Sequence, residues 1–140
     1  MSKYNNKKVV YASITFDSKA ERDYYLYLLD LKQRGIVTDI QLQPSFLLQE
    51  KFRKNGKLYR ENTYKADFKV TYADGHVEII DVKGMVTKDF AIKRKVFEYK
   101  YPELRLLLMA YSQIDGGWIN LDELKKARSS RRNKKSSSVY

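Results

Sequence analysis

The sequence has 140 residues, of which 43% are hydrophobic and 14% aromatic, enough for one domain with a buried core. Its 28 Lys and Arg residues exceed its 17 Asp and Glu residues, and the net charge of +11 makes nucleic acid the first partner to consider. There is no cysteine and one histidine, His76, which excludes disulfide frameworks, zinc fingers, cysteine nucleophiles and mechanisms that need two histidines.

The chain shows no secretory signal, and its most apolar run, residues 104–110, is too short to cross a bilayer. No basic amphipathic helix with a wide apolar face stands out, which favours nucleic acid over a membrane surface. We therefore expect no membrane partner and a cytoplasmic location.

The first third of the chain predicts an irregular arm or short strand over residues 1–15 and a helix over 18–34. Ser18 is a favourable N-cap residue, apolar side chains recur at helical spacing, and a glycine follows the last turn. Alternating apolar and polar residues over 36–43, ended by Pro44, predict a strand.

Two hairpins are predicted in the middle of the chain. They join residues 46–52 to 57–61 and residues 64–72 to 76–83. Asn55-Gly56 and Asp74-Gly75 are residue pairs that favour the tight turns of such hairpins. In the strand over 64–72 apolar and polar side chains alternate, so one face is expected to be buried.

The last third predicts two further helices and a buried strand. The expected elements are a helix over 87–101, a strand over 104–110, a brief pairing at 118–119 and a short helix over 121–128. Ile92, Val96 and Tyr99 are expected to form one side of the first of these helices. The order of elements predicts an α/β (α+β) fold, in which a central mixed sheet with antiparallel hairpins is flanked by helices.

Residues 1–128 are expected to form the single domain, and residues 129–140 a disordered basic tail. The segment 129–138 has no apolar side chain, so burial cannot offset the entropy lost when it becomes ordered. The tail either contacts phosphates or only keeps the protein soluble. Its candidate nucleic-acid-binding residues are Arg131, Arg132, Lys134 and Lys135.

The second hairpin carries the main functional signal. Asp81 and Lys83 are two residues apart, so they share one face of their strand. Asp67 and Asp81 are symmetric about residue 74, so a turn there places them near one another. The alternative is a register shifted by one residue, which turns the side chains to the other face. Two adjacent carboxylates repel unless a cation lies between them, and carboxylate oxygens suit a hard divalent ion such as Mg²⁺.

A divalent ion polarises a phosphodiester and acidifies a bound water, and Lys83 can orient that water or stabilise charge on the phosphate. These residues therefore suffice for phosphodiester hydrolysis without histidine or cysteine. The alternative is that Asp81 and Lys83 form only a surface ion pair and that Asp67 is a solvated strand residue. Aspartate is disfavoured inside strands, which favours the functional interpretation.

This arrangement resembles the PD-(D/E)xK nuclease superfamily, which implies a restriction-endonuclease-like fold. The matching residues are Ala66-Asp67-Phe68 and Asp81-Val82-Lys83-Gly84, with Ala66 at the nominal proline and Asp81 where glutamate is frequent. The resemblance covers roughly residues 14–110. It implies that Asp67, Asp81 and the backbone carbonyl of Val82 bind Mg²⁺ or Mn²⁺, and that Lys83 serves the attacking water or the phosphate.

Members of this superfamily often supply a further carboxylate from the first helix, and Glu21 is the candidate. Alternatively, Glu21 completes a capping box with Ser18. Gln43, before Pro44, resembles a position in small phage-encoded proteins of this type and is expected to contact nucleic acid, or is an ordinary polar strand residue. Lys88 and Lys95 follow the motif on a helix and either contact phosphates or form a solvated face.

The resemblance and the charge together predict a metal-dependent endodeoxyribonuclease of phage origin, located in the host cytoplasm if viral. Branched or junction DNA is the expected substrate, because the chain leaves little room for a sequence-reading domain, and a homodimer would allow paired cuts. The alternatives are a non-catalytic nucleic-acid-binding protein that keeps the nuclease fold, and an RNA-cleaving enzyme. His76 follows a turn glycine and is expected to be exposed, with no catalytic part.

Overall fold

The structure is a computed structural model that describes residues 7–137. Its helices are α1 (Lys19–Gln33), α2 (Lys88–Lys100) and α3 (Leu121–Ser137). Its strands are β1 (Val9–Tyr11), β2 (Ile14–Phe16), β3 (Val37–Leu42), β4 (Ser45–Gln49), β5 (Phe52–Lys54), β6 (Lys57–Tyr59), β7 (Asn62–Lys65), β8 (Phe68–Tyr72), β9 (Val77–Val82), β10 (Arg105–Ser112) and β11 (Gly117–Asn120). None of the helices in this range is long and apolar enough to cross a bilayer.

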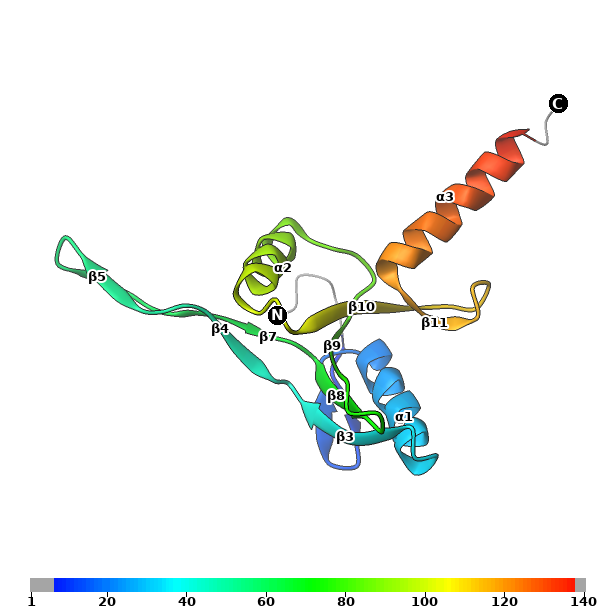
Figure 1. Ribbon diagram of the computed structural model, residues 1–140, viewed down its shortest axis with the longest axis horizontal. Coiled ribbons are helices and arrows are strands. Elements are labelled where there is room, and N and C mark those ends of the chain that lie inside the picture. The colour runs from blue at the N-terminus through cyan, green and yellow to red at the C-terminus, as the bar shows by residue number, and fades with distance from the viewer. Residues whose placement is uncertain (1–6, 138–140) are drawn as a thin grey trace.

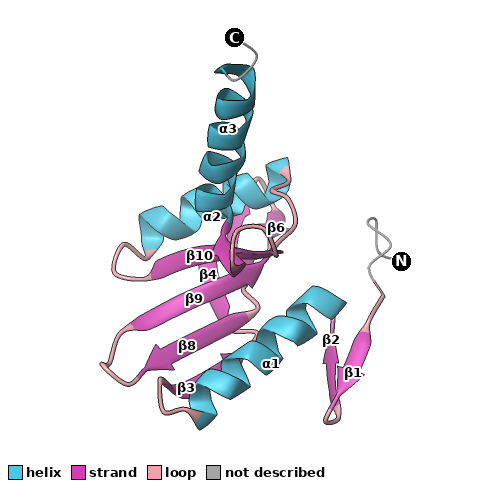
Figure 2. Cartoon of the chain, turned by 90° about the vertical axis from the view of Figure 1, so that its right-hand side faces the viewer, coloured by secondary structure: helices cyan, strands magenta, loops and turns pink. Residues whose placement is uncertain are grey.

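A five-stranded sheet with the order β11-β10-β9-β8-β3 forms the centre of the molecule (Figures 1 and 2). β9 and β10 run parallel and are connected through α2, whereas the other neighbours are antiparallel. The prediction of a mixed α/β fold, with a central mixed sheet flanked by helices, is therefore confirmed. The predicted arm at the start of the chain is a hairpin of β1 and β2 as far as it is described.

Helices cover both faces of the sheet. On one face, α1 packs Tyr24 and Leu28 against Phe68 and Val70 of β8. On the other face, α2 and the first turn of α3 contribute Phe90, Phe97, Leu121 and Leu124 to a second core. The neighbours Ile79 and Ile80 of β9 are both fully buried, one in each core, because successive side chains of a strand point to opposite faces.

The first helix begins and ends as predicted. Its N-cap is Ser18, whose hydroxyl accepts a hydrogen bond from the backbone N–H of Glu21, and its C-cap is Arg34. Gly35 follows with φ 77°, in the left-handed region where glycine is favourable. The buried side of this helix includes Glu21, which places a carboxyl group beneath the helix, facing the sheet.

The second helix lies where predicted, but of the side expected to be apolar only Val96 packs against a core. Phe90 and Phe97 are buried, whereas Ile92 is 65% exposed and Tyr99 is 87% exposed. Phe90 and Phe97 are seven residues apart and therefore share one side of the helix. Two buried aromatic rings remove more apolar area from water than the expected set does, and this decides the orientation of α2.

A two-stranded ribbon leaves the sheet at a pair of bends. One bend, at Gln43-Pro44, separates β3 from β4, and the other, at Ala66-Asp67, separates β7 from β8. The N–H of Gln43 donates to the carbonyl of Asp67 at 2.9 Å, and the N–H of Ala66 donates to that of Pro44 at 3.0 Å. The prediction of one continuous strand over 64–72 is therefore wrong, because the strand breaks where its partner strand bends.

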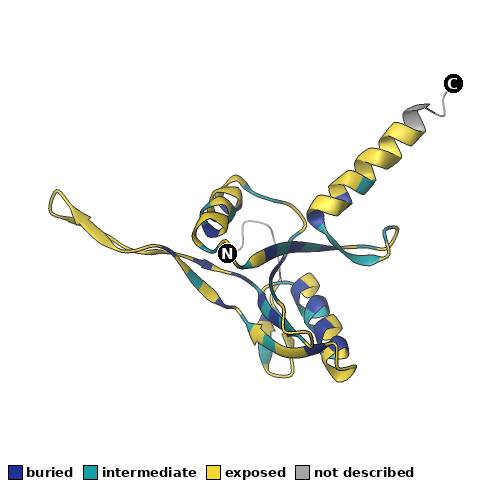
Figure 3. Cartoon of the chain, viewed as in Figure 1, coloured by how far each residue is buried: buried dark blue, intermediate teal, exposed yellow. Residues whose placement is uncertain are grey.

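Beyond these bends the ribbon continues through β4 and β7 to β5 and β6 (Figure 1). Asn55 and Gly56 form its turn with φ 51° and 75°, as the sequence predicts for a tight hairpin. Residues 49–63 are exposed throughout, and the outer ribbon contributes nothing to either core (Figure 3).

The third helix continues to Ser137, nine residues beyond its predicted end at residue 128. The expectation of a disordered tail is wrong for residues 129–137, and residues 138–140 lie outside the described chain. The outer turns are exposed (Figure 3), so local interactions account for the helix. Asp122 and Glu123 complement its N-terminal dipole, and Arg131 forms an ion pair with Asp115 at 2.5 Å.

Phe97→Ala is expected to lower the free energy of unfolding by about 3–5 kcal/mol, because it removes a fully buried ring. Tyr99→Ala, two residues further along the same helix, is expected to change it by no more than ~0.5 kcal/mol. Urea unfolding followed by circular dichroism measures both values. Similar losses for the two variants would contradict the orientation of α2.

Candidate active site

The register of the β8–β9 hairpin brings Asp67 opposite Asp81. The pairs run from Thr71 with Val77 to Phe68 with Ile80, each symmetric about residue 74 as the sequence predicts. The N–H of Asp67 donates to the carbonyl of Ile80 at 3.1 Å, which continues the pairing into the bend. The two aspartates therefore lie side by side at the open end of the hairpin.

Asp67 is held by the backbone of the neighbouring strand. Its Oδ2 accepts a hydrogen bond from the N–H of Val82 at 2.8 Å. Burial raises the pKa of Asp67, and the negative charge of Asp81 and a hydrogen bond between the two carboxyl groups raise it further. Two acids in this arrangement share either a proton or a cation.

Asp81 is buried, with 4% of its surface exposed, and two side chains contact it. The hydroxyl of Tyr64 donates to Oδ2 of Asp81 at 2.5 Å. Burial and the charge of Asp81 raise the pKa of Tyr64, so its hydroxyl stays protonated and remains a donor. The Nζ of Lys83 lies 3.6 Å from Oδ1 of Asp81 and 4.4 Å from the centre of the Phe90 ring.

A cavity of about 510 Å³ opens beside this cluster. Asp67, Asp81 and Lys83 form part of its wall, so all three reach the same open cavity. Lys65 of β7 and Lys93 of α2 add positive charge to the wall. The lining also includes the acids Asp17 and Asp89. The cavity therefore holds both carboxylates, which suit a cation, and ammonium groups, which suit an anionic substrate.

Glu21 lies close to the cluster, but it is not one of the residues that line the cavity. It is 4% exposed, and its carboxylate accepts a hydrogen bond from the backbone N–H of Asp17. Burial raises the pKa of Glu21 to about 7, followed by the charge of Asp17 and, more weakly, that of Asp81. Glu21 thus accepts from the residue before the N-cap rather than from the N–H of Ser18 that a capping box uses, and it adds negative charge near the two aspartates.

Among the described residues, no group of three or more His, Cys, Asp or Glu side chains is arranged to hold a metal ion. The assembled acidic donors are the two carboxylates of Asp67 and Asp81. Mg²⁺ is commonly bound by one or two carboxylates, while water and substrate phosphate complete its six ligands. Two adjacent buried acids fit that donor set, because a cation between them removes their repulsion.

The other predicted contact residues lie outside the cavity. Gln43 is exposed with φ 50°, and its backbone fixes the bend that carries Asp67. Lys88 and Lys95 are exposed on α2. Arg131 pairs with Asp115, Arg132 and Lys134 are exposed on α3, and the side chain of Lys135 lies outside the described part of the structure.

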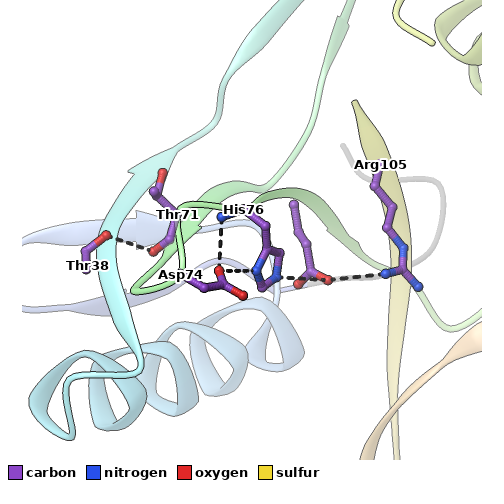
Figure 4. A network of polar contacts seen from close by, with 6 residues as sticks. Thr38, Thr71, Asp74, His76 and Arg105 are labelled. Carbon is purple, nitrogen blue, oxygen red and sulfur yellow. Dashed lines mark hydrogen bonds and ion pairs between the residues drawn. The ribbon is translucent and has the colours of Figure 1, made fainter. Parts of the chain in front are cut away.

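His76 lies in the turn at the opposite end of the hairpin from Asp67 and Asp81. Its polar contacts with Asp74 are drawn in Figure 4. It is exposed, its ring stacks on Tyr72, and it pairs with Asp74. On its other side Glu78 connects it to Arg105. These contacts tie the turn to the edge of the sheet.

Sequence reasoning missed Tyr64 and Lys65 as members of the site. The clue in the sequence was that Tyr64 lies only three residues before Asp67. A buried tyrosine needs a hydrogen-bond partner for its hydroxyl, and a nearby carboxylate can supply one. The bend at residues 66–67 changes which side chains share a face, and it brings Tyr64 onto Asp81. Strand alternation alone therefore does not predict this contact.

A protein-family model described as "Protein of unknown function (DUF1064)" matches residues 1–114. No curated protein and no solved structure matches the chain. The matched region contains the whole cluster around Asp67 and Asp81, whereas α3 lies beyond it.

Asp67→Asn is expected to raise the unfolding temperature by a few degrees at pH 8 in metal-free buffer, and by less at pH 5. The pKa of Asp67 is higher in the folded than in the unfolded protein, so its ionisation opposes folding. That cost is absent below the unfolded pKa of about 4 and grows as the pH rises. Asparagine removes the charge and keeps an acceptor for the N–H of Val82.

Thermal unfolding at both pH values with EDTA measures the effect, and Asp39→Asn, at an exposed position of β3, is the matched control. A loss of stability in Asp67→Asn that is the same at pH 5 and pH 8 would show that the carboxylate is only a structural acceptor.

Proposed function

We propose that this chain, which belongs to the DUF1064 family, is a nuclease with a restriction-endonuclease-like core that hydrolyses DNA with Mg²⁺ or Mn²⁺. The observation that carries the proposal is the meeting of Asp67, Asp81 and Lys83 at one cavity. Two acids and a lysine on adjacent strand positions are the groups that metal-assisted phosphodiester hydrolysis needs.

The carboxylates of Asp67 and Asp81 would hold the metal ion, with the backbone carbonyl of Val82 as a further ligand. A divalent ion bound there polarises the phosphate and acidifies the attacking water. The Nζ of Lys83 lies beside Asp81, where it would orient the phosphate and stabilise the charge that develops on it. Tyr64 fixes the carboxylate of Asp81 through its hydrogen bond, and so acts as a positioning residue.

The substrate follows from the charge of the molecule. Lys65 and Lys93 border the acidic cluster, and the chain as a whole carries +11. A phosphodiester backbone is a polyanion that can contact both the lysines beside the site and the basic surface of the rest of the chain. We propose branched or junction DNA as the substrate, and an action in the cytoplasm, that of the host if the protein is viral. A homodimer would place two such sites on two strands.

A second candidate is a non-catalytic nucleic-acid-binding protein that keeps this fold. The observation in its favour is that each acid already has a partner within the chain. Asp67 accepts from Val82, while Asp81 accepts from Tyr64 and pairs with Lys83. In that case the cluster only stabilises the hairpin, and the basic surface alone accounts for binding.

Asp81→Asn and Lys83→Ala are each expected to reduce cleavage of DNA by ~10²–10³-fold, because each removes a group that stabilises the reacting phosphate or its metal. Binding is expected to change little, since most of the positive charge lies elsewhere. The assay compares a four-way junction, linear duplex and a structured RNA with Mg²⁺ or EDTA.

Lys32→Ala, at an exposed position of α1, is the control for Lys83→Ala and is expected to cut normally. Wild-type protein that binds these substrates but cuts none of them supports the non-catalytic candidate. Cleavage of RNA alone would instead assign the same site to an RNA substrate.

Tyr64→Phe is expected to raise the Mg²⁺ concentration needed for half-maximal cleavage by ~10–100-fold, because Asp81 loses the hydrogen bond that orients it. Titration of Mg²⁺ in the cleavage assay measures this shift. Tyr99→Phe is the matched control, since that ring is 87% exposed. A lower maximal rate with no change in Mg²⁺ requirement would show that Tyr64 does not position a metal-binding carboxylate.

A further inference from the structure

The outer ribbon carries a concentration of positive charge away from the candidate site. Residues 51–60, which comprise β5, the turn and β6, are called the basic ribbon here; they project from the sheet and are all exposed (Figures 1 and 3). The basic ribbon contains five cations and no acid. They are Lys51, Arg53, Lys54, Lys57 and Arg60. No ion pair within the described chain involves these five side chains.

We propose that the basic ribbon lies in the major groove of duplex DNA and holds the duplex whose backbone reaches the candidate site. This inference rests on the proposed function for the identity of the polyanion. A major groove is about 12 Å wide and admits a two-stranded ribbon, whose strands are about 4.8 Å apart.

The register of the ribbon places positive charge on both of its faces. Lys54 pairs with Lys57 on one face of the ribbon. The next pair, Arg53 with Leu58, lies on the other face. Like charges directly opposite one another destabilise an isolated hairpin, and a polyanion removes that cost. A ribbon inside a groove has a phosphate backbone on each side, so charge on both faces is used.

Two stacked aromatic rings stiffen the ribbon where it has no core. Phe52 pairs with Tyr59, and their ring centres are 4.8 Å apart with an angle of 5° between the planes. The ammonium group of Lys57 lies 5.0 Å from the Tyr59 ring. A two-stranded hairpin without such contacts is marginally stable in water. The stack therefore presents the cations in a defined arrangement before DNA binds.

The whole two-stranded ribbon, from the bend at Pro44 to the tip of the basic ribbon, is as long as one turn of duplex. Ten residues lead from Pro44 at the bend to Lys54 at the tip, about 33 Å at a strand rise of about 3.3 Å. That is the length of about ten base pairs at about 3.4 Å each. Because Asp67 lies at the base of the ribbon, the tip reaches duplex about one helical turn from the phosphate at the site.

A second copy of the chain is a poorer occupant for the same surface. Both copies would carry a net charge of +11 and the same five cations, so pairing of two basic ribbons brings like charges together. Charge complementarity thus selects an anionic partner over self-association.

The triple variant Arg53→Gln/Lys54→Gln/Lys57→Gln tests the proposal through equilibrium binding in EDTA, where no cleavage occurs. Fluorescence anisotropy with a 30-base-pair duplex, a probe length of about three helical turns, is measured over a range of NaCl concentrations. Affinity at physiological salt is expected to fall at least ~10-fold, and the slope of log affinity against log salt by about 2–3, since each phosphate contact contributes about 0.9.

The matched control is Lys19→Gln/Lys32→Gln/Arg34→Gln, which removes the same charge from exposed positions at the two ends of α1. Its affinity and slope are expected to stay near those of the wild type. Equal losses in the two triple variants would overturn the proposal, because net charge alone would then account for binding. A loss for single-stranded DNA as large as for duplex would overturn the groove assignment.

Lys51→Gln/Arg60→Gln provides a second variant away from the turn, and a reduction of its salt slope by about 1.8 supports the same surface.

The binding test is separable from the proposed hydrolysis. If the ribbon variant cleaves normally and binds DNA as the control does, the proposed role of the basic ribbon is rejected and the proposed hydrolysis stands. If binding depends on the basic ribbon but the protein cuts no substrate, the proposed hydrolysis is rejected and the role of the basic ribbon stands.

Discussion

The adjacency of Asp67 and Asp81 is the constraint on which the candidate site depends. Two carboxylates in a buried position repel one another, so the fold must supply groups that hold them there. The N–H of Val82, the hydroxyl of Tyr64 and the ammonium group of Lys83 do this from one side of the hairpin. The two hydrophobic cores above and below β9 keep that hairpin from relaxing.

The features that the sequence predicts are those with a local cause. The register of the second hairpin follows from its three-residue turn over residues 73–75, and it correctly brings Asp67 opposite Asp81. The ends of α1 follow from Ser18 and Gly35, whose side chain and backbone preferences fix a helix boundary. Each of these outcomes depends on residues a few positions apart, so no knowledge of the packed molecule is needed.

The features that the sequence does not predict depend on distant contacts. The orientation of α2 is decided by where Phe90 and Phe97 find a core. The outer part of α3 gains an ion pair between Arg131 and Asp115, which lies sixteen positions earlier in the chain. The break at Ala66-Asp67 is set by the bend of the other strand at Gln43, to which it is hydrogen-bonded. The contact between Tyr64 and Asp81 follows from that break.

The paired bends relate the two proposed parts of the molecule to each other. On the inner side of the bend, Asp67 turns its carboxylate to the N–H of Val82 and lies beside Asp81. On the outer side, the same two strands leave the sheet and carry the basic ribbon away from it. Gln43 adopts a left-handed backbone conformation at this point, which is costly for a residue other than glycine. One local geometry therefore fixes both the position of the acidic pair and the direction in which the ribbon leaves the sheet.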